Sequence, residues 1–540
     1  MHAPPSQDSE PSEPTRKPQT PPQTPLTLPS GGKTAPVTEV ARLMLSQLPS
    51  FVLLPLLPYI QGFAADEDGA VEPMAVATAC SGCDMLLQIL GVLSQEMEAK
   101  WGFRPEFSHA FSVERDATKQ AWLLNEFEHM QHLFKDVSEL EGHTAYCLKE
   151  CRDVLIPHAM LFAAGFSCTS RSRLNNSRSQ NRGGIQNHGQ DATATTWRGV
   201  AAYIKRCRPP MVVLEYVQEL GEVTEHAMTD AEYIIEFLEG SGYTCKFYKI
   251  HADKYGSPVP RMRLYFIGVH GGGDKSEILQ LTHETLEATY VNILFPWDRF
   301  LLPAEEVCKV REARQADADD DAPEKRRKIS HPPRYLDDHC DIFRTSLIEW
   351  PIDINKMSEE FQAAMVSLND RQREIVVFCE LKWPYENIVA AEQGTEPKAE
   401  FLDVNMSLQY LLKGTSDRTA WRPTTGCLTG SGKYWMRRAN PQKPSTMDYR
   451  LLHGVELMAL AGWSRELFHK DVNLLCGKTH SLLSSFAGNA FSGFALLPVC
   501  FAVFTARAKI SVSAGIEEGR AASPSLDSDE LFDLLNSDSQ

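Results

Sequence analysis

The feature that most constrains the fold is an alternation of short apolar runs and helical patterns between residues 72 and 271. Six runs have the length and composition of strands, at Met74–Cys80, His109–Glu114, Met160–Ala164, Met211–Leu214, Thr244–His251 and Leu264–Val269. Helical periodicity is found between them, at Asp84–Lys100, Ala117–Phe127, Thr195–Lys205 and Thr229–Glu239. Such alternation predicts an α/β fold with a doubly wound, mostly parallel sheet over residues 72–271.

The segments on either side differ in composition. Residues 1–37 are dense in Pro, Ser and Thr and predict a disordered arm, which a lead-in segment at 38–71 joins to the sheet. Residues 272–447 are expected to form an inserted smaller region with a disordered loop at 313–334. Residues 448–510 are expected to return to the sheet. The acidic tail at 511–540 is predicted to be disordered and offers a site for a protein partner.

The net charge of −17 means that any surface for nucleic acid has to be a local basic patch. Thirteen scattered cysteines and no secretory signal favour a reducing compartment. Of two apolar stretches, Leu48–Phe63 is too short for a membrane span and holds two prolines, whereas Phe486–Ala506 reaches spanning length. Because Phe486–Ala506 contains glycine, asparagine and proline, we expect a buried helix rather than a single span, and no membrane partner.

Residues at the ends of the first strands suit a nucleoside cofactor. The first strand ends in the small-residue turn ACSGCDM, Ala79–Met85, which leaves backbone N–H groups free at a helix start. An acid follows each of the next two apolar runs, although a helix cap is the ordinary role of one such residue. The candidate cofactor-binding residues are Ala79, Cys80, Ser81, Gly82, Cys83, Asp84, Glu114 and Asp136.

The stretch Val154–Asn175 begins as a buried strand, breaks at Gly165 and continues as a polar loop headed by Cys168. An α/β enzyme presents a nucleophile in this way at the carboxyl end of its sheet. Arginines follow closely and favour a thiolate, with a buried structural cysteine as the alternative. The loop also suits contact with a negatively charged polymer, through Arg171, Arg173, Arg178 and Arg182.

Three further charged residues lie at the ends of apolar runs, and we expect them to share one pocket with the cysteine: Glu215, Arg261 and Arg263. In the inserted region, residues 421–445 interleave aromatic and basic side chains. This pattern is typical of nucleic-acid contact, with a solvated surface as the alternative. The candidate contacts are Arg422, Lys433, Arg437 and Arg438.

Two cysteine pairs raise the question of a zinc site or a thiol–disulfide exchanger, Cys80 with Cys83 and Cys147 with Cys151. The first pair falls inside the cofactor turn, and no histidine is suitably spaced beside either pair. We therefore expect no metal.

Taken in order, these segments resemble the cytosine-5 DNA methyltransferases. ACSGCDM is similar to the family's cofactor turn, FSVERD to its ribose-binding acid segment and KDV to its adenine-contacting segment. GFSC resembles the Pro-Cys nucleophile loop, LEYVQEL the Glu-Asn-Val segment and YGSPVPRMRLYFIG the Gln-x-Arg-x-Arg segment. AGNAFSG is similar to the closing Gly-Asn-Ala helix, and YRLLHGVELMALAGW to the segment before it. The resemblance covers about residues 72–271 and 448–503.

The resemblance implies a Rossmann-like, S-adenosylmethionine-dependent methyltransferase that acts on carbon 5 of cytosine in DNA. Cys168 is then the nucleophile, and residues 272–447 are the target-recognition region. The cofactor set gains Arg115, Val137, Gly165, Asn489 and Ala490. A short basic cluster at 324–328 is consistent with nuclear import, so the nucleus is the expected location.

The chain also departs from the family pattern. Asp84 and Met85 stand where glycines are usual, Ser167 replaces the proline, Tyr216 the asparagine and Val259 the glutamine. Two alternatives therefore stay open. One is an RNA cytosine-5 methyltransferase of the same fold, and the other is a catalytically degenerate homologue that binds nucleic acid.

Overall fold

The computed structural model describes residues 26–27, 34–65, 72–167, 185, 192–221, 228–303, 306–307, 357–365, 368–382, 399–405, 421–440, 443–464 and 479–514. The predicted loop at 313–334 and nearly all of the predicted arm and tail lie outside these residues.

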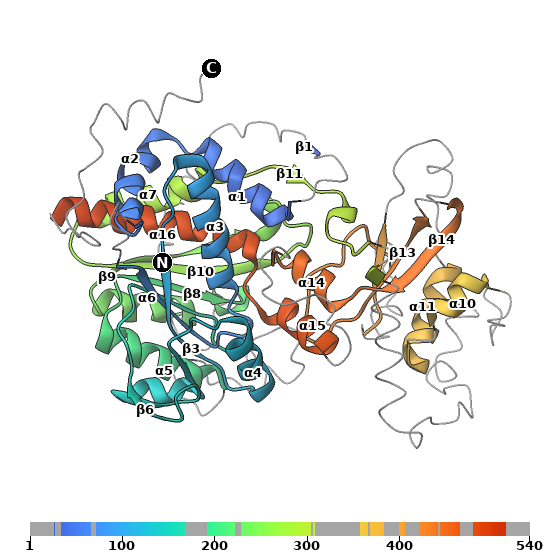
Figure 1. Ribbon diagram of the computed structural model, residues 1–540, viewed down its shortest axis with the longest axis horizontal. Coiled ribbons are helices and arrows are strands. Elements are labelled where there is room, and N and C mark those ends of the chain that lie inside the picture. The colour runs from blue at the N-terminus through green and yellow to red at the C-terminus, as the bar shows by residue number, and fades with distance from the viewer. Residues whose placement is uncertain are drawn as a thin grey trace, which may run out of the picture.

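A mixed sheet organises the larger part of the described chain (Figure 1). Its strand order among the described residues is β6-β5-β4-β3-β2-β7-β8-β10-β9. The strands are β2 (Met74–Ala79), β3 (Phe107–Val113), β4 (His132–Phe134), β5 (Thr144–Cys147), β6 (Arg152–Leu155), β7 (Leu161–Ala164), β8 (Met211–Tyr216), β9 (Tyr243–His251) and β10 (Met262–His270). The centre, β4-β3-β2-β7-β8, is parallel throughout. The predicted doubly wound sheet is confirmed, and the pattern missed only the three short strands β4 to β6.

Both faces of the parallel centre are buried, which explains why its strands are continuous apolar runs. Along β7, Leu161 and Ala163 enter one core, while Phe162 and Ala164 enter the other. The first face is covered by α3 (Met85–Trp101), α4 (Ala117–Glu126), α7 (Lys275–Ala288) and α16 (Gly493–Ala514), and the second by α5 (Ala192–Cys207) and α6 (Asp230–Gly240) (Figure 1). The four predicted helices correspond to α3, α4, α5 and α6.

Strand β10 is inserted between β8 and β9 and runs antiparallel to both. Its first residues therefore lie at the edge where β8 ends. In the register of this pair, Tyr265 is opposite Glu215 and Leu264 is opposite Tyr216. The start of β10 thus lies at the same edge of the sheet as the carboxyl ends of β2, β7 and β8, where doubly wound sheets bind ligands.

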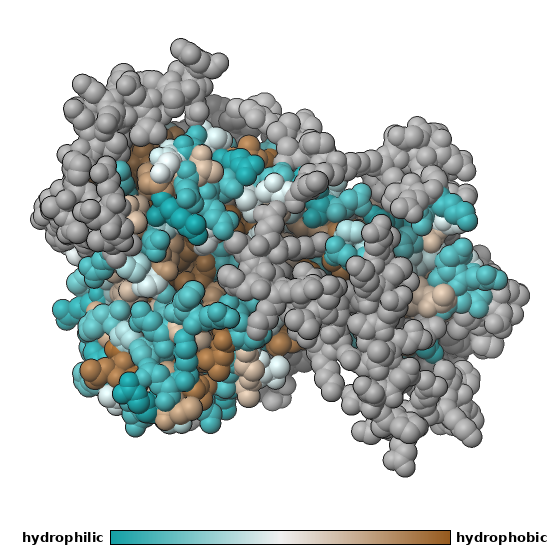
Figure 2. All heavy atoms as spheres, viewed as in Figure 1, coloured by the Kyte–Doolittle hydropathy of each residue, from teal (hydrophilic) through white to brown (hydrophobic). Residues whose placement is uncertain are grey.

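The apolar stretch predicted as a buried helix is divided between the end of α15 (Thr479–Asn489) and α16. Helix α16 is long and apolar enough to cross a membrane, but 89% of its most apolar window is buried within the fold. It packs against α2 (Ser50–Gln61), α3, α7 and β10. Hydrophilic side chains dominate the described surface on the face that Figure 2 shows. Helix α16 is therefore a core helix, as predicted.

The lead-in segment forms two helices, α1 (Pro36–Gln47) and α2, which are bent by 113° relative to each other. The short apolar stretch in α2 buries Val52, Leu56 and Leu57 in the first core. Pro55 and Pro58 lie inside the helix. The expectation of a docked core segment is confirmed.

The inserted region has its own small sheet, which lies apart from the large one (Figure 1). It consists of β12 (Glu400–Asp403), β13 (Tyr434–Asn440) and β14 (Lys443–Leu451), all antiparallel. Helices α10 (Glu359–Met365) and α11 (Asp370–Lys382) share an apolar core with it. Helix α7 lies within the residues assigned to this region by sequence but packs on α16, so the small sheet begins later in the chain.

Candidate functional site

The turn after β2 carries left-handed backbone at the carboxyl edge of the sheet. Cys80, Gly82 and Asp84 have φ angles of 55°, 59° and 62°. The N–H of Gly82 donates to Glu114 Oε2 at 2.9 Å, and the N–H of Asp116 donates to Oε1 at 2.9 Å. A carboxylate offers about four acceptor positions, so Glu114 retains capacity for the hydroxyls of a bound ribose.

Asp84 explains how the turn works without a second glycine. Asp tolerates left-handed backbone better than most residues, and its buried carboxylate is held from below the turn. Thr78 Oγ1 donates to Asp84 Oδ2 at 3.0 Å, and Ser112 Oγ also donates to Oδ2. His109 Nε2 lies 2.6 Å from Ser112 Oγ and completes this network. Oδ1 is buried without a hydrogen-bond partner among the described residues.

The two cysteines of the turn are unsuited to thiolate chemistry. Burial, with the negative charges of Glu114 and Asp136, raises the pKa of Cys80 to about 12. Burial also raises the pKa of Cys83. Both thiols are therefore protonated near neutral pH, whereas metal binding and disulfide exchange need the thiolate.

The acid segments that follow lie as the sequence predicted, at successive strand ends. Asp136 ends the loop after β4 and accepts a hydrogen bond from the N–H of Ser138 at 2.9 Å. Arg115 is exposed, and its Nε lies 3.8 Å from Asp136 Oδ2. Val137, the residue after Asp136, packs against α5. The contact is close, since a Cβ on Gly199 of α5 would lie 2.0 Å from the Val137 carbonyl oxygen. Helix α5 therefore fixes the backbone of this segment.

The residues that follow β7 and lead to the predicted nucleophile are closely packed. A Cβ on Gly165 would lie 2.7 Å from the ring of Phe491, and the Phe166 ring packs on Tyr216 with centroids 4.7 Å apart. The carbonyl oxygen of Ser167 accepts a hydrogen bond from the Tyr216 hydroxyl at 3.0 Å. Cys168 lies outside the described residues, as do Arg171, Arg173, Arg178 and Arg182.

Glu215 and Arg263 form a buried ion pair at the end of β8. Arg263 Nε lies 3.0 Å from Glu215 Oε1, without the alignment of a hydrogen bond. Burial raises the pKa of Glu215, while Arg263 and then Arg261 lower it. Burial lowers the pKa of Arg263, but Glu215, Cys427 and Tyr265 together outweigh burial, and the pKa is raised. The pair therefore combines a fixed cation with a carboxyl group that takes up a proton more readily than an exposed one.

Arg261 has a different position from the one that the sequence predicted. Its Nη1 donates to the carbonyl oxygen of Gly488 at 3.0 Å, and its Nη2 donates to that of Ala490 at 2.6 Å. These carbonyls lie at the end of α15, where a cation is favoured. Arg261 therefore anchors this helix end, and the expectation that it holds the substrate or Glu215 directly is wrong.

A small cavity of about 20 Å³ joins the cofactor turn, the nucleophile segment and the closing helix. Among the candidate residues, its lining includes Cys80, Ser81, Asp84, Gly165, Asn489 and Ala490. At the same edge of the sheet, Glu114 keeps free acceptor positions, which fit the ribose hydroxyls of a nucleoside cofactor. Ala79 and Cys83 are buried beneath the turn, so their contribution is through the backbone.

A second cavity, of about 720 Å³, lies between α3 and the ends of α4. It is lined by Gln88, His109 and Trp463 and by the first residues of β3. The amino ends of the strands face it, and none of the predicted site residues contributes to it. Ligands of such sheets bind at the opposite edge, so this cavity is separate from the candidate site.

The basic candidates of the inserted region divide into two groups. Arg422 and Lys433 are exposed and stay candidates for phosphate contact. Arg437 is buried, with its Nη1 2.7 Å from Glu380 and its Nη2 2.7 Å from Glu400. Its predicted phosphate contact is therefore wrong. Arg438 is also engaged within the protein, by Asp298 and, at 3.5 Å, by Asp448.

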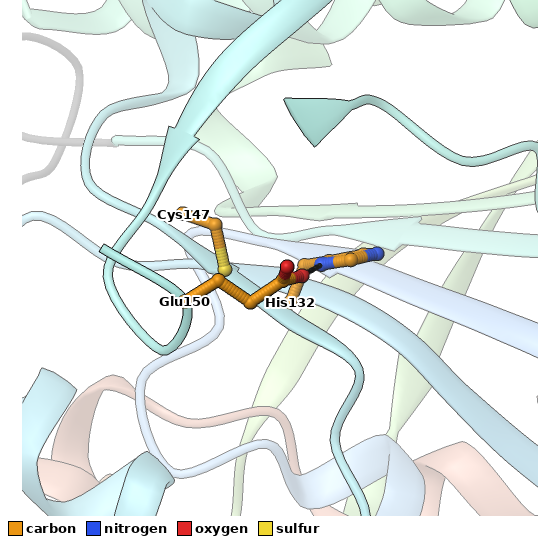
Figure 3. A group of neighbouring side chains, drawn as sticks. All are labelled: His132, Cys147 and Glu150. Carbon is orange, nitrogen blue, oxygen red and sulfur yellow. Dashed lines mark ion pairs between the residues drawn. The ribbon is translucent and has the colours of Figure 1, made fainter. Parts of the chain in front are cut away.

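Folding also brings together a group that the sequence did not predict, His132, Cys147 and Glu150 (Figure 3). Their ligand-type atoms lie within 4.8 Å of one another, and Cys151 is not among them. His132 Nδ1 is 2.7 Å from Glu150 Oε1, and Arg152 Nε donates to Glu150 Oε2 at 2.9 Å. Glu150 thus lies between His132 and Arg152, and the three ligand-type atoms are close enough to hold one metal ion. The expectation of no metal stays a prediction.

Four residues near the site were missed by the sequence analysis. Phe491 lines the small cavity, and Thr193 and Tyr216 hold the Ser167 carbonyl. Cys427 places its sulfur 4.0 Å from Arg263 Nη2. Only Tyr216 carried a signal, as a departure from the family pattern next to Glu215. The others approach through contacts that no local pattern encodes.

Two solved structures are similar to this chain over most of their length. The S. pombe Dnmt2 methyltransferase is 12% identical with a TM-score of 0.37, over 80% of this chain and 98% of that one. The Entamoeba histolytica methyltransferase EhMeth is 12% identical with a TM-score of 0.38, over the same shares.

A curated relative and a family model match at the level of sequence. The DNA (cytosine-5-)-methyltransferase DMT5 of Cryptococcus neoformans var. grubii is 27% identical over 233 residues, which are 42% of this chain and 9% of that protein. The chain thus spans less than a tenth of this relative. The model for C-5 cytosine-specific DNA methylases matches residues 90–331, which include Glu114, Glu215 and Arg263 but not the turn at 79–84. Residues 90–331 therefore match the C-5 cytosine-specific DNA methylase family.

Proposed function

We propose that this chain transfers a methyl group from S-adenosylmethionine to carbon 5 of cytosine in DNA, through a covalent adduct of Cys168 with a flipped base. The observation that carries the proposal is the Glu215–Arg263 ion pair at 3.0 Å at the end of β8, where the adjacent residue Tyr216 contacts the nucleophile segment. A family domain over residues 90–331 supports the reaction class.

The chemistry needs a nucleophile because carbon 5 of cytosine is unreactive. The thiolate of Cys168 adds to carbon 6, which makes the ring an enamine with a nucleophilic carbon 5. After methylation, loss of the carbon 5 proton restores the double bond and expels Cys168. A stacked base cannot enter such a site, so the cytosine has to leave the helix.

Glu215 and Arg263 stabilise the charge that develops on the ring. The raised pKa of Glu215 favours sharing of a proton with the ring nitrogen N3. Arg263, at the start of β10, supplies a cation for the base carbonyl and for Glu215. In the low dielectric of a buried site, such contacts count for more than they would in water.

The methyl group comes from the cofactor when it is bound. Glu114 is assigned to the ribose hydroxyls, and Asp136 with Val137 to the adenine. Cys80, Ser81 and Asp84 of the turn are assigned to one side of the cofactor, and Asn489 and Ala490 to the opposite side. Arg422 and Lys433 are assigned to phosphate contacts outside the pocket.

The adduct itself is the test. A duplex carrying 5-fluorocytosine is incubated with the protein and S-adenosylmethionine, and denaturing electrophoresis and intact mass report covalent complexes. Fluorine cannot leave as the proton does, so the adduct is expected to persist. Cys168→Ser should abolish it. Cys427→Ser is the matched control, since this thiol lies 4.0 Å from Arg263 Nη2, and it should leave the adduct intact.

The same assay separates the alternatives. Trapping on 5-fluorocytosine RNA but not on DNA would replace DNA as the substrate. If neither polymer forms an adduct or receives a labelled methyl group, the chain is a catalytically degenerate homologue that binds nucleic acid. Loss of the adduct in Cys427→Ser but not in Cys168→Ser would contradict the assignment of the nucleophile.

We also propose a nuclear location and a protein partner for the acidic tail, on the basis of the basic cluster at 324–328 and the composition of 511–540. The basic cluster lies outside the described residues, as does the tail beyond Ala514, where α16 ends. Neutral substitution of the cluster should shift a fluorescent fusion out of the nucleus, and deletion of the tail should not.

A further inference from the structure

The residue before the predicted nucleophile is Ser167, whose backbone is not restrained by a ring as that of a proline would be. Its backbone is nevertheless held by hydrogen bonds at both the carbonyl oxygen and the N–H group. The carbonyl oxygen accepts hydrogen bonds from Tyr216 Oη at 3.0 Å and from Thr193 Oγ1 at 2.8 Å. The N–H donates to Thr196 Oγ1 at 3.2 Å. Three side-chain hydroxyls therefore hold the backbone of this one residue.

The three hydroxyls come from rigid elements. Thr193 and Thr196 lie in the first turn of α5, and Thr196 Oγ1 donates back to the Ala192 carbonyl at 2.6 Å. Tyr216 ends β8, is 1% exposed and packs on Phe166. Because helix and strand are both fixed by the core, the position of the Ser167 carbonyl is set by the fold and not by the loop.

We propose that Tyr216 and Thr193 are positioning residues, whose hydroxyls fix the Ser167 carbonyl and thereby aim Cys168 at the base beside Glu215. This inference rests on the proposed function. The proposal explains two departures from the family pattern together, Ser167 and Tyr216. Ser167 lacks the ring of a proline, and the Tyr216 hydroxyl restrains its carbonyl from β8 instead. Neither hydroxyl touches the reacting atoms.

The test compares Tyr216→Phe and Thr193→Val, which remove one hydroxyl each and keep the shape. Tyr203→Phe is the matched control, because buried Tyr203 Oη donates to the Pro157 carbonyl at 2.9 Å, on the chain that enters β7 at the opposite edge. All four proteins are compared in single-turnover trapping on 5-fluorocytosine DNA and in equilibrium binding of DNA and S-adenosylmethionine.

Tyr216→Phe should slow trapping by roughly ten- to hundredfold, since small misplacements of a reacting group have effects of this size. The dissociation constants should stay within about twofold. Thr193→Val should behave similarly and Tyr203→Phe like the wild type. Equal trapping rates for Tyr216→Phe and Tyr203→Phe would overturn the proposal, as would a loss confined to binding.

A second readout does not depend on activity. Hydrogen exchange of the peptide covering residues 165–168 should be about fivefold faster in Tyr216→Phe, as expected for one lost hydrogen bond of about 1 kcal/mol. Tyr203→Phe should leave it unchanged. If the wild type forms no adduct at all, the proposed function fails, and the exchange rates alone decide whether Ser167 is held by Tyr216. Unchanged exchange in Tyr216→Phe would then reject the positioning role.

Discussion

At the scale of single residues, the site is defined by which charges are paired with each other. Glu215 is buried and has Arg263 as its ion partner. Arg261 lies two residues before Arg263, and its Nη1 and Nη2 atoms donate hydrogen bonds to carbonyls at the end of α15. Two arginines that look equivalent in the motif therefore have separate roles, one in the pocket and one in the scaffold. Of the two arginines, Arg263 lowers the pKa of Glu215 more.

Removing the Arg263 cation should raise the pKa of Glu215 further. A carboxyl group whose folded pKa is raised binds its proton more tightly in the folded state, so its contribution makes stability fall as pH rises from the unfolded pKa through the folded one. We expect Arg263→Met to lose stability between pH 5 and 8, by up to about 3–5 kcal/mol for an unpaired buried charge. Urea unfolding at several pH values measures this.

The double variant Arg263→Met/Glu215→Gln is the control. It lacks the titrating group, so the contribution of Glu215 to the pH dependence of stability should be absent over the same range. If the single and double variants show the same slope, burial of Glu215 is not the source of the effect.

At the scale of elements, a buried ion pair joins β14 of the small sheet to α14, which packs in the first core. Glu456, in the first turn of α14 (Gly454–Leu460), receives Arg450 Nη2 at 2.6 Å and Nη1 at 2.7 Å from β14. It also accepts the N–H groups of Leu302 and His453 at 2.7 Å each. Four donors on one carboxylate join three segments of the chain at a single point.

Acid should weaken this junction. Against the cost of burial, Arg450 and the other donors hold the pKa of Glu456 at about 2. A lowered folded pKa gives stability that is complete above the unfolded value near 4.5 and is lost as pH falls toward 2. Glu456→Gln should remove this part of the acid dependence and cost about 3–5 kcal/mol at pH 7, since Arg450 stays buried and unpaired.

Thermal and urea unfolding between pH 7 and 2.5 provide the measurement. Arg450→Met/Glu456→Gln removes the stranded cation while an amide oxygen still accepts the backbone N–H groups. It should recover part of the loss. No difference between this double variant and Glu456→Gln would contradict the ion-pair account.

At the scale of the whole molecule, the inserted region meets the sheet body along α15 and around Trp297. Trp297 Nε1 donates to the Pro423 carbonyl at 3.1 Å, and its ring lies 4.0 Å from that of Phe401. Gly488 on α15 leaves room for the backbone of Thr429 and Gly430. Figure 1 shows α14 and α15 between the large sheet and the small one. The placement of residues 421–432 against α15 therefore depends on a close backbone contact.

Gly488→Ala should displace the loop at 421–432. A Cβ there would lie 2.0 Å from the Thr429 carbonyl carbon and 2.1 Å from the Gly430 nitrogen, and backbone atoms cannot give way as a side chain does. We expect faster hydrogen exchange across 421–432 and a trapping rate reduced by at least about tenfold. Gly240→Ala is the matched control, because nothing lies within 4 Å of its Cβ in α6. Equal behaviour of the two variants would show that the contact is not needed.

The sequence by itself determined the parallel core of the fold and the segments of the site. Six strands and four helices follow from apolar periodicity, which is a local property, and Glu114, Asp136 and Glu215 follow from their places at strand ends. The short strands β4 to β6 have too few residues for a periodic signal. Arg437 shows the same limit, since its basic–aromatic context matches a nucleic-acid surface equally well in solvent or in a core.

Only the tertiary structure determined which residues contact one another. Gly488 and Ala490 meet Arg261 across more than two hundred residues, His132 reaches Cys147 from another strand, and Tyr216 reaches Ser167 from β8. Which donor meets which acceptor depends on strand order and on register, because hydrogen bonds and ion pairs act only over a few ångströms. Residue types therefore indicate the chemistry that is available, and the packing of the sheet selects which side chains carry it out.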